Sequence, residues 1–310
     1  MADLCSVLNI EDPTRLNTDQ LWAPARRQGP GWMRFPIGLY ADGEELVELD
    51  LRTPFEGGMG LHGLVVGTCG AGKTSGVITE VMSACLTHSP EELIIAYAAG
   101  TPYSAAETVS RFPHVVAAVD DLRQDDAALD RFCDVLEAEL DRRDAMLAAI
   151  DDCRDVTAYN QRRLADPDLA AIPVLWVIVE DYDVVFADPI RGMRLREVIT
   201  RIARVGRSLH VFFQLVGQTK DTLRGLTNMI GYTIAARTAT LEDSRAAIGA
   251  TDAALIPSEG QAGTAYLRTS GNDPRRFRYF SAPNTKPLDE LATAIAKALR
   301  AATDNPPAPM

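Results

Sequence analysis

Residues that build disulfide frameworks and zinc sites are scarce in this 310-residue sequence, which has five cysteines and four histidines. No two cysteines form a CxxC pair, and no histidine stands at ligand spacing from another histidine or from a cysteine. The odd number of cysteines therefore indicates reduced thiols in a cytosolic protein and excludes a disulfide framework and a tetrahedral zinc site. The cysteines are Cys5, Cys69, Cys85, Cys133 and Cys153, and the histidines are His62, His88, His114 and His210.

Long hydrophobic runs and a surplus of positive charge are also missing. The longest apolar stretch, residues 169–179, contains Pro173 and is far shorter than the roughly 20 residues of a membrane-spanning helix. The first residues lack the basic segment of a signal peptide. With 31 Lys and Arg against 43 Asp and Glu, the formal net charge is −12, which disfavours a protein that wraps a phosphate backbone. We expect a soluble, cytoplasmic chain whose partners are proteins or nucleotides.

The remaining composition is that of an ordinary globular protein, with 46% hydrophobic and 24% charged residues. One large α/β domain fits this length as well as two domains of about 150 residues do. Residues 1–34 are polar and rich in turn residues, so we expect a lead-in or linker there. We expect the main folded domain over residues 35–302 and a flexible, proline-rich tail over residues 303–310.

Short apolar runs bounded by turn residues predict a central, mostly parallel sheet, because they alternate with helical patterns along the chain. Residues 35–51 alternate in polarity around Asp42-Gly43 and predict a β-hairpin ahead of that sheet. Residues 263–267 and 276–280 predict a second, closing hairpin. We expect buried strands over residues 63–66, 93–97, 115–119, 174–179, 211–215 and 232–236, and helices over residues 73–86, 104–111, 127–150, 193–205 and 287–301.

The strongest motif is Gly-Thr-Cys-Gly-Ala-Gly-Lys-Thr at residues 67–74, which fits G-x-x-x-x-G-K-[ST] between a predicted strand and a predicted helix. Its glycines allow the loop to turn backbone N–H groups onto phosphate oxygens, and the helix that follows adds its positive dipole end. Lys73 is expected to pair with the β- and γ-phosphates of ATP, and Thr74 to place its hydroxyl on Mg²⁺. The expected nucleotide-binding residues are Gly67, Thr68, Cys69, Gly70, Ala71, Gly72, Lys73 and Thr74.

A second acidic element follows the apolar strand at residues 174–179, where Glu180 and Asp181 stand at the carboxyl end. In the usual order Asp comes first and holds the water shell of Mg²⁺, and Glu comes second and polarises the attacking water. The order is reversed here, so each carboxylate could miss its position by about 1 Å, which is enough to lower turnover about 10²-fold. We expect Glu180 to bind the metal and both acids to act in catalysis, with nucleotide binding better preserved than hydrolysis. Asp183 is expected to be solvated.

These residues resemble the FtsK/SpoIIIE-type ATPase modules of the type VII secretion motor, the EccC/EssC family, over nearly the whole chain. His62, Pro90 and His114 support the resemblance because no general phosphate-loop rule requires them. The resemblance implies a P-loop NTPase fold of the RecA/FtsK type, with helices flanking the sheet, in a cytoplasmic module at the inner face of the cell membrane. Further matching segments lie at residues 16–22, 35–38, 57–63, 87–90, 112–115, 204–211 and 236–238.

The family's motors contain several modules, and the resemblance implies that this chain is one module of a hexameric motor. The implied partners are sister modules or like subunits, the membrane secretion complex and secreted WXG100-type proteins. Gln218 matches the family's sensor glutamine, and Arg237 and Arg245 match arginines that can reach a neighbouring module's γ-phosphate. Competent modules carry Asp-Phe-Lys-Gly-Gly where residues 96–100 read Ala-Tyr-Ala-Ala-Gly. That departure is typical of degenerate, non-leading modules, which hold nucleotide with weak or no ATP hydrolysis.

Two other functions stay open at this point. Six arginines within residues 191–207 would give an FtsK-like DNA translocase a basic helix, although the net charge makes DNA an unfavoured ligand. The same arginines could instead face a neighbouring module or acidic residues of this chain. The other open function is that of a regulatory scaffold that holds nucleotide permanently.

Overall fold

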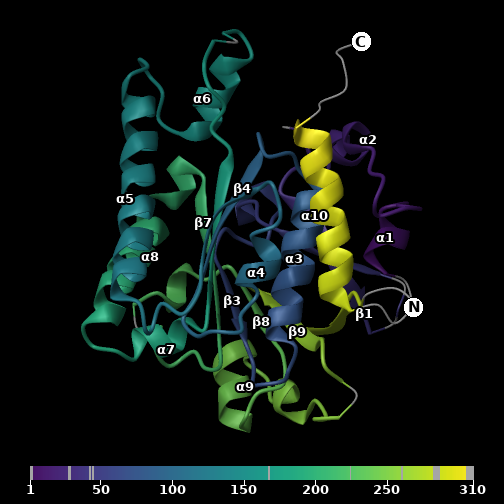
Figure 1. Cartoon of the computed structure of the whole chain (residues 1–310). Coiled ribbons are helices and arrows are strands. Elements are labelled where there is room, and N and C mark those ends of the chain that lie inside the picture. The colour runs from purple at the N-terminus through teal and green to yellow at the C-terminus, as the bar shows by residue number, and fades with distance from the viewer. Residues whose placement is uncertain are drawn as a thin grey trace.

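The computed structural model describes residues 3–26, 29–41, 43, 45–166, 168–223, 225–259, 261–281 and 287–304. Within these ranges, ten strands form one sheet in the order β2-β1-β10-β9-β8-β3-β7-β6-β4-β5 (Figure 1). The strands are β1 (Arg34–Tyr40), β2 (Leu46–Asp50), β3 (Gly63–Val66), β4 (Leu93–Ala99), β5 (Val115–Val119), β6 (Val174–Glu180), β7 (Val211–Gly217), β8 (Tyr232–Ala235), β9 (Thr264–Thr269) and β10 (Arg275–Tyr279).

The sheet has a parallel half and an antiparallel half. The strands from β8 through β3, β7, β6 and β4 to β5 run parallel. The remaining strands, β9, β10, β1 and β2, continue the sheet in antiparallel pairs. Both predicted hairpins are confirmed, although Asp42 in the first turn lies outside the described residues. The P-loop strand β3 is therefore an interior strand with parallel neighbours on both sides.

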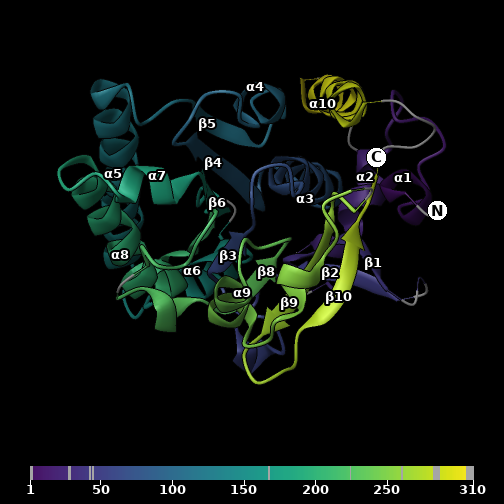
Figure 2. The same cartoon turned by 90° about the horizontal axis from the view of Figure 1, so that it is seen from below.

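Helices cover both faces of the parallel half, which confirms the predicted α/β fold (Figure 2). α3 and α10 lie on one face, and α5 and α8 lie on the other. The side chains of β6 alternate between these two cores, so all seven residues of the strand are buried. The helices are α1 (Leu4–Val7), α2 (Thr18–Trp22), α3 (Lys73–Thr87), α4 (Ala106–Val109), α5 (Asp126–Ala148), α6 (Val156–Arg163), α7 (Tyr182–Phe186), α8 (Arg191–Leu209), α9 (Leu241–Ile248) and α10 (Leu288–Asp304), with 3-10 turns η1 (Ala23–Ala25), η2 (Pro54–Glu56), η3 (Thr227–Met229) and η4 (Asp252–Leu255).

One strand prediction is wrong in its environment. β5 has the predicted bounds, but it forms the edge of the sheet next to β4 instead of a strand covered on both sides. Val116 is 60% exposed, and the pairing of β4 with β5 shifts register between Ile95 and Ala96. An apolar run predicts a strand, but it does not encode the order of strands in the sheet.

The N-terminal segment is bound to the rest of the domain through specific contacts. Leu4 of α1 is buried in the core on the α3 face. The indole N–H of Trp22 donates to the carbonyl of Cys85 at 3.2 Å, and the N–H of Met33 donates to Nε2 of buried His88 at 3.1 Å. At the other end, α10 continues to Asp304, and residues 305–310 of the predicted tail lie outside the described residues. Across the described ranges, no helix combines the length and apolar character needed to cross a bilayer.

Candidate nucleotide-binding site

The P-loop, residues 67–74, joins β3 to α3 at the carboxyl ends of the parallel strands. β8 and β7 flank β3, and β6 follows β7 in the sheet. Segments that leave these strands meet the P-loop at the edge of the sheet where open α/β folds bind ligands. Glu180, Gln218 and Arg237 stand at or just after these strand ends, so the topology gathers most of the expected site residues.

The backbone of the P-loop keeps several donors free for an anion. Gly70 and Gly72 have φ of +74° and +95°. A Cβ at residue 72 would lie 2.6 Å from the nitrogen of Gly263, so glycine is required there. Among the described residues, the N–H groups of Cys69, Gly70 and Gly72 have no backbone partner, and the first turn of α3 adds unpaired N–H groups. Such donors at a helix N-terminus suit phosphate oxygens.

Lys73 lies across the P-loop. Its Nζ donates to the carbonyl oxygens of Gly67 at 2.8 Å and Thr68 at 3.1 Å. The N–H of Thr68 donates in turn to the carbonyl of Arg237 at 2.7 Å, which fixes the loop against the segment after β8. The ammonium group is therefore held over the loop, where it can make charge-assisted hydrogen bonds to phosphates.

Glu180 at the end of β6 faces the P-loop helix. The Thr74 hydroxyl donates to Oε1 of Glu180, and the Tyr97 hydroxyl donates to Oε2. Glu180 is 3% exposed, and burial raises the pKa of its carboxyl group while the two hydrogen bonds act in the opposite direction. A hydroxyl and a carboxylate that converge are the hard oxygen donors that Mg²⁺ prefers. The donor set of Thr74 and Glu180 thus fits the expected metal.

Asp181 is bound to a different segment of the chain. Its Oδ2 accepts a hydrogen bond from the hydroxyl of Thr101, in the loop after β4. Its backbone has φ of +50°, a left-handed conformation that costs a non-glycine residue energy. The carboxylate expected to polarise the attacking water is therefore engaged by Thr101, whereas Glu180 alone contacts the P-loop helix through Thr74.

The expectation of a solvated Asp183 is wrong. Asp183 is buried, and its Oδ2 accepts the backbone N–H of Gln218 at 2.9 Å. Burial raises the pKa of its carboxyl group. A Cβ at residue 217 would lie 2.7 Å from Oδ1 of Asp183, which explains why glycine stands at the end of β7. The Gln218 side chain is exposed at the same edge of the sheet.

The two expected arginines differ in their positions. The carbonyl of Arg237 accepts hydrogen bonds from both the N–H and the hydroxyl of Thr68, so Arg237 lies beside its own P-loop. Arg245 is exposed on α9. Among the described residues, the Arg245 side chain makes no hydrogen bond or ion pair with the P-loop.

Sequence reasoning missed two residues that shape this site, Tyr97 and Thr101, and it missed the role of Asp183. Tyr97 and Thr101 bind the two acids after β6, and Asp183 fixes the backbone of Gln218. The available signal was Tyr97 itself, a residue with a hydroxyl in a strand otherwise made of small and aliphatic side chains. The contacts of Thr101 and Asp183 depend on loop geometry that local sequence patterns do not describe.

A buried carboxyl group, Glu80 of α3, lies at the centre of a polar network next to the P-loop strand. Oε1 accepts from the Tyr279 hydroxyl at 2.5 Å, and Oε2 accepts from the Gln214 amide at 2.6 Å. The Tyr232 hydroxyl donates to Oε1 of Gln214 at 2.7 Å. Burial raises the pKa of Glu80 from its usual 4.5 to about 7, with a smaller contribution from the Glu180 charge. The network therefore holds a carboxyl group that titrates near neutral pH.

We expect Glu80→Gln to flatten the pH dependence of stability. The folded state binds the Glu80 proton more tightly than the unfolded chain, so the stabilisation is full below pH 4.5 and is lost as the pH rises through about 7. Between pH 5 and 8, the wild type should lose roughly 3 kcal/mol more unfolding free energy than the variant in urea titrations. Glu197→Gln, at an exposed position on α8, is the control. Parallel pH profiles of wild type and Glu80→Gln would contradict the expectation.

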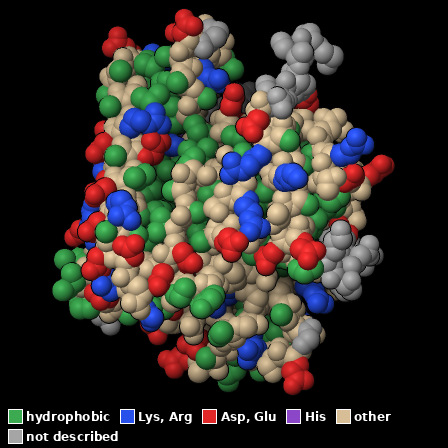
Figure 3. Space-filling model, in the orientation of Figure 1, with side chains coloured by type: hydrophobic (Ala, Val, Ile, Leu, Met, Phe, Trp, Pro, Cys, Tyr) green, Lys and Arg blue, Asp and Glu red, His purple; other side chains and the backbone are tan. Residues whose placement is uncertain are grey.

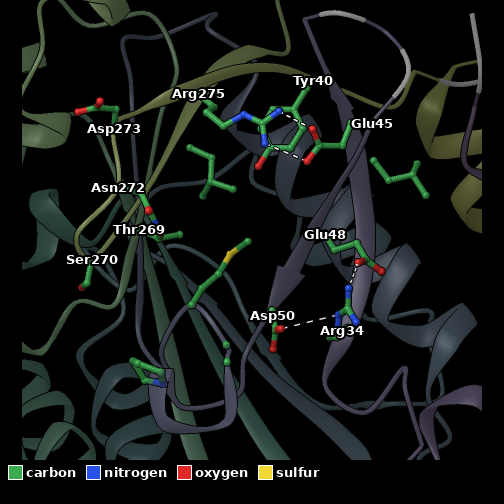
Figure 4. Close-up of a pocket in the computed structure, with 16 residues that line it drawn as sticks. Arg34, Tyr40, Glu45, Glu48, Asp50, Thr269, Ser270, Asn272, Asp273 and Arg275 are labelled. Carbon is green, nitrogen blue, oxygen red and sulfur yellow. Dashed lines mark hydrogen bonds and ion pairs between the residues drawn. The ribbon is translucent and has the colours of Figure 1, made fainter.

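A hollow of about 610 Å³ lies against the antiparallel half of the sheet (Figure 4). Both arginines that line it are paired with carboxylates. Arg34 pairs with Glu48 and approaches Asp50, and Arg275 pairs with Glu45 at 2.6 Å and lies over the Tyr40 ring. No P-loop residue lines the hollow, so it is separate from the nucleotide site.

Three of the six arginines of α8 form ion pairs with acids of the same chain. Arg191 pairs with Asp126, Arg201 pairs with Asp141, and Arg194 contacts Glu137 at 2.8 Å. All three acids belong to α5. In Figure 3 acidic and basic side chains are interspersed over the α5 side of the molecule. These contacts neutralise three of the six arginines on the helix that a DNA-binding function would need.

Comparison with known families matches residues 23–221 to the FtsK/SpoIIIE family. ESX-3 secretion system protein EccC3 of Mycobacterium tuberculosis is 33% identical over 287 residues, covering 89% of this chain and 21% of that protein. ESX secretion system protein EccC of Thermomonospora curvata is 32% identical over 288 residues, covering 90% of this chain and 21% of that protein. The chain thus spans about a fifth of the length of these relatives.

Solved structures show the same similarity. The cytoplasmic domain of the Thermomonospora curvata type VII secretion ATPase EccC matches with a TM-score of 0.86 at 30% identity, covering 96% of this chain and 34% of that chain. ATPases 2 and 3 of Thermomonospora curvata EccC, in complex with a signal sequence peptide, match with a TM-score of 0.74 at 20% identity, covering 90% and 49%. The second match shows a shared fold alone.

Proposed function

The chain belongs to the FtsK/SpoIIIE family, and from that premise we propose that it is an ATP-binding module of a type VII protein secretion motor. The module binds Mg-ATP and hydrolyses it weakly or not at all. One observation carries this proposal. Of the two acids, Glu180 accepts a hydrogen bond from Thr74 of the P-loop, whereas Asp181 accepts one from Thr101 in the loop after β4.

The P-loop geometry supports nucleotide binding. Free N–H groups, the helix N-terminus and the Lys73 ammonium converge on one place at the sheet edge. When bound, Mg²⁺ would supply charge neutralisation for the β- and γ-phosphates. In this chain Thr74 and Glu180 would hold the ion, Glu180 through its water shell.

The positions of the two acids support weak hydrolysis. Glu180 occupies the position that faces Thr74, so Asp181 is left with the task of polarising the attacking water. Asp181 is one methylene shorter than the usual Glu and is held by Thr101. A displacement of about 1 Å lowers turnover by about 10²-fold. Ala96 and Ala98 add no polar group to the end of β4.

The proposed partners are those of a multi-module motor. The relatives are named as secretion system proteins and are more than four times as long as this chain, which supports further modules beside this one. The proposal includes a hexamer of sister modules or like subunits at the inner face of the membrane. WXG100-type proteins are the proposed cargo, as the resemblance to the EccC/EssC family implies. Arg245, exposed on α9, is better placed than Arg237 to reach a neighbouring site.

The ion pairs between α8 and α5 disfavour the alternative of a DNA translocase.

Joining the module to its sister modules tests which defect limits turnover. If the reversed acids limit hydrolysis, joining should raise the rate of this site by less than about tenfold, because an arginine supplied in trans acts only on a competent site. Steady-state ATP turnover should be measured for the domain alone and for the joined chain with the sister P-loop lysines replaced by alanine. A rise approaching 10³-fold, the low end for a supplied arginine, would show instead that the lone module merely lacks its neighbour.

A further inference from the structure

Tyr97 is a fully buried residue of β4 whose hydroxyl group reaches the end of β6. The hydroxyl donates to Oε2 of Glu180 and accepts the N–H of Ala105 at 3.1 Å. The same N–H lies 3.4 Å from Oε2 of Glu180. Tyr97, Ala105 and Glu180 therefore form a closed set of contacts in which each polar atom has a partner.

The two oxygens of Glu180 have separate partners. Oε1 accepts the Thr74 hydroxyl on the P-loop side, whereas Oε2 is held on the β4 side. Replacing an Asp by a Glu at such a position adds one methylene and one rotatable bond, so the far oxygens can move unless they are bound. Because Oε2 is held by Tyr97, Oε1 is fixed in an orientation that faces Thr74.

We propose that Tyr97 is a positioning residue that holds the longer Glu180 side chain so that it can serve the Mg²⁺ site in place of an aspartate. This inference rests on the proposed Mg-ATP function. It goes further because it assigns a task to a residue of a neighbouring strand whose hydroxyl contacts Glu180 and Ala105 and lies outside the P-loop.

The test uses Tyr97→Phe, which removes the hydroxyl group and keeps the ring in its buried place. ATP affinity is measured by calorimetry with Mg²⁺ and with EDTA, so that the gain caused by the metal is separated from binding of the nucleotide alone. We expect the increase of ATP affinity that Mg²⁺ causes to become about tenfold smaller, as for loss of a hydrogen bond to a charged group. The ATP affinity in EDTA should stay unchanged. Tyr232→Phe is the matched control, because its buried hydroxyl donates to Gln214 and not to Glu180.

A second background separates positioning from general packing. In Glu180→Asp the extra methylene is gone, so adding Tyr97→Phe should change the metal-dependent gain by less than about twofold. An unchanged gain in Tyr97→Phe alone, or an equal loss in both backgrounds, would overturn the role of Tyr97. Absence of any metal-dependent gain in the wild type would instead remove the proposed function on which the inference rests. Thermal unfolding midpoints well above the assay temperature show that the single variants are folded, and Tyr232→Phe shows what the loss of a buried hydroxyl does to ATP affinity when Glu180 keeps its partner.

Discussion

Lys73→Ala is expected to lower ATP affinity by at least about 100-fold, since one charged partner of the phosphates is lost and each charge-assisted hydrogen bond contributes about 1.5–3 kcal/mol. The fold should survive, because Lys73 is half-buried at the surface of the P-loop and its Nζ contacts only the carbonyl oxygens of Gly67 and Thr68. Calorimetric titration with Mg-ATP measures the affinity.

The matched control for Lys73 is Lys297→Ala, which removes a lysine from an exposed position on α10. That variant should bind ATP as the wild type does, and both variants should unfold at the wild-type temperature within a few degrees. Undiminished ATP affinity in Lys73→Ala would contradict the assignment of residues 67–74 as the nucleotide site.

The second large effect concerns the order of the acids. Replacing Glu180-Asp181 by Asp-Glu is expected to raise ATP turnover by about 10- to 100-fold. The change shortens the side chain at residue 180 and lengthens the one at residue 181 by one methylene each, which corrects a displacement of each carboxylate of about 1 Å. A glutamate at residue 181 can extend past Thr101, which now binds the shorter Asp181. Turnover is measured by phosphate release at saturating Mg-ATP.

Asp181→Ala alone provides the comparison for this double change. If Asp181 contributes little to catalysis, the single variant should keep most of the low wild-type rate. A wild-type rate that is high and falls to zero in the Asp-Glu variant would show that the reversed pair is already the working catalyst.

The local structure of the candidate nucleotide site could be predicted where its residues are contiguous in the sequence. The motif at residues 67–74 specifies a loop whose glycines are required by backbone geometry, and a neighbouring chain segment crowds Gly72 as that requirement implies. Glu180 follows an apolar run whose side chains alternate between two cores, so its place at a strand end followed from local pattern. Such features depend on residues close together in the chain.

The rest of the site depends on contacts between distant residues. Tyr97 and Glu180 are 83 positions apart, and Thr101 and Asp181 are 80 apart; no local pattern encodes that β4 lies beside β6. Asp183 is buried because α7 turns its side chain back toward the N–H of Gln218. A charged residue shortly after a strand does not by itself predict such a contact. The exposed edge position of β5 follows from the order of strands in the sheet, which an apolar run does not predict.

The pairing of α8 with α5 shows a different kind of limit. From the sequence alone, the arginines of residues 191–207 can face a neighbour, DNA or acidic residues of the same chain. The packing of α5 against α8 answers this for Arg191, Arg194 and Arg201, because it brings Asp126, Glu137 and Asp141 to their side chains. Charge on one helix predicts a partner of opposite charge, but it does not identify that partner.

This module is proposed to hold Mg-ATP far longer than a competent ATPase takes to hydrolyse it. The most direct measurement mixes the purified protein with an equal amount of radiolabelled ATP and Mg²⁺, stops the reaction in acid after 1 s and after longer times, and separates ATP from ADP. An enzyme with a typical turnover of about 10 s⁻¹ would convert the bound nucleotide within the first second. We predict that ATP still dominates after about a minute and remains bound to the protein during rapid gel filtration. Conversion of most of the bound ATP to ADP at about 1 s⁻¹ or faster would contradict the account.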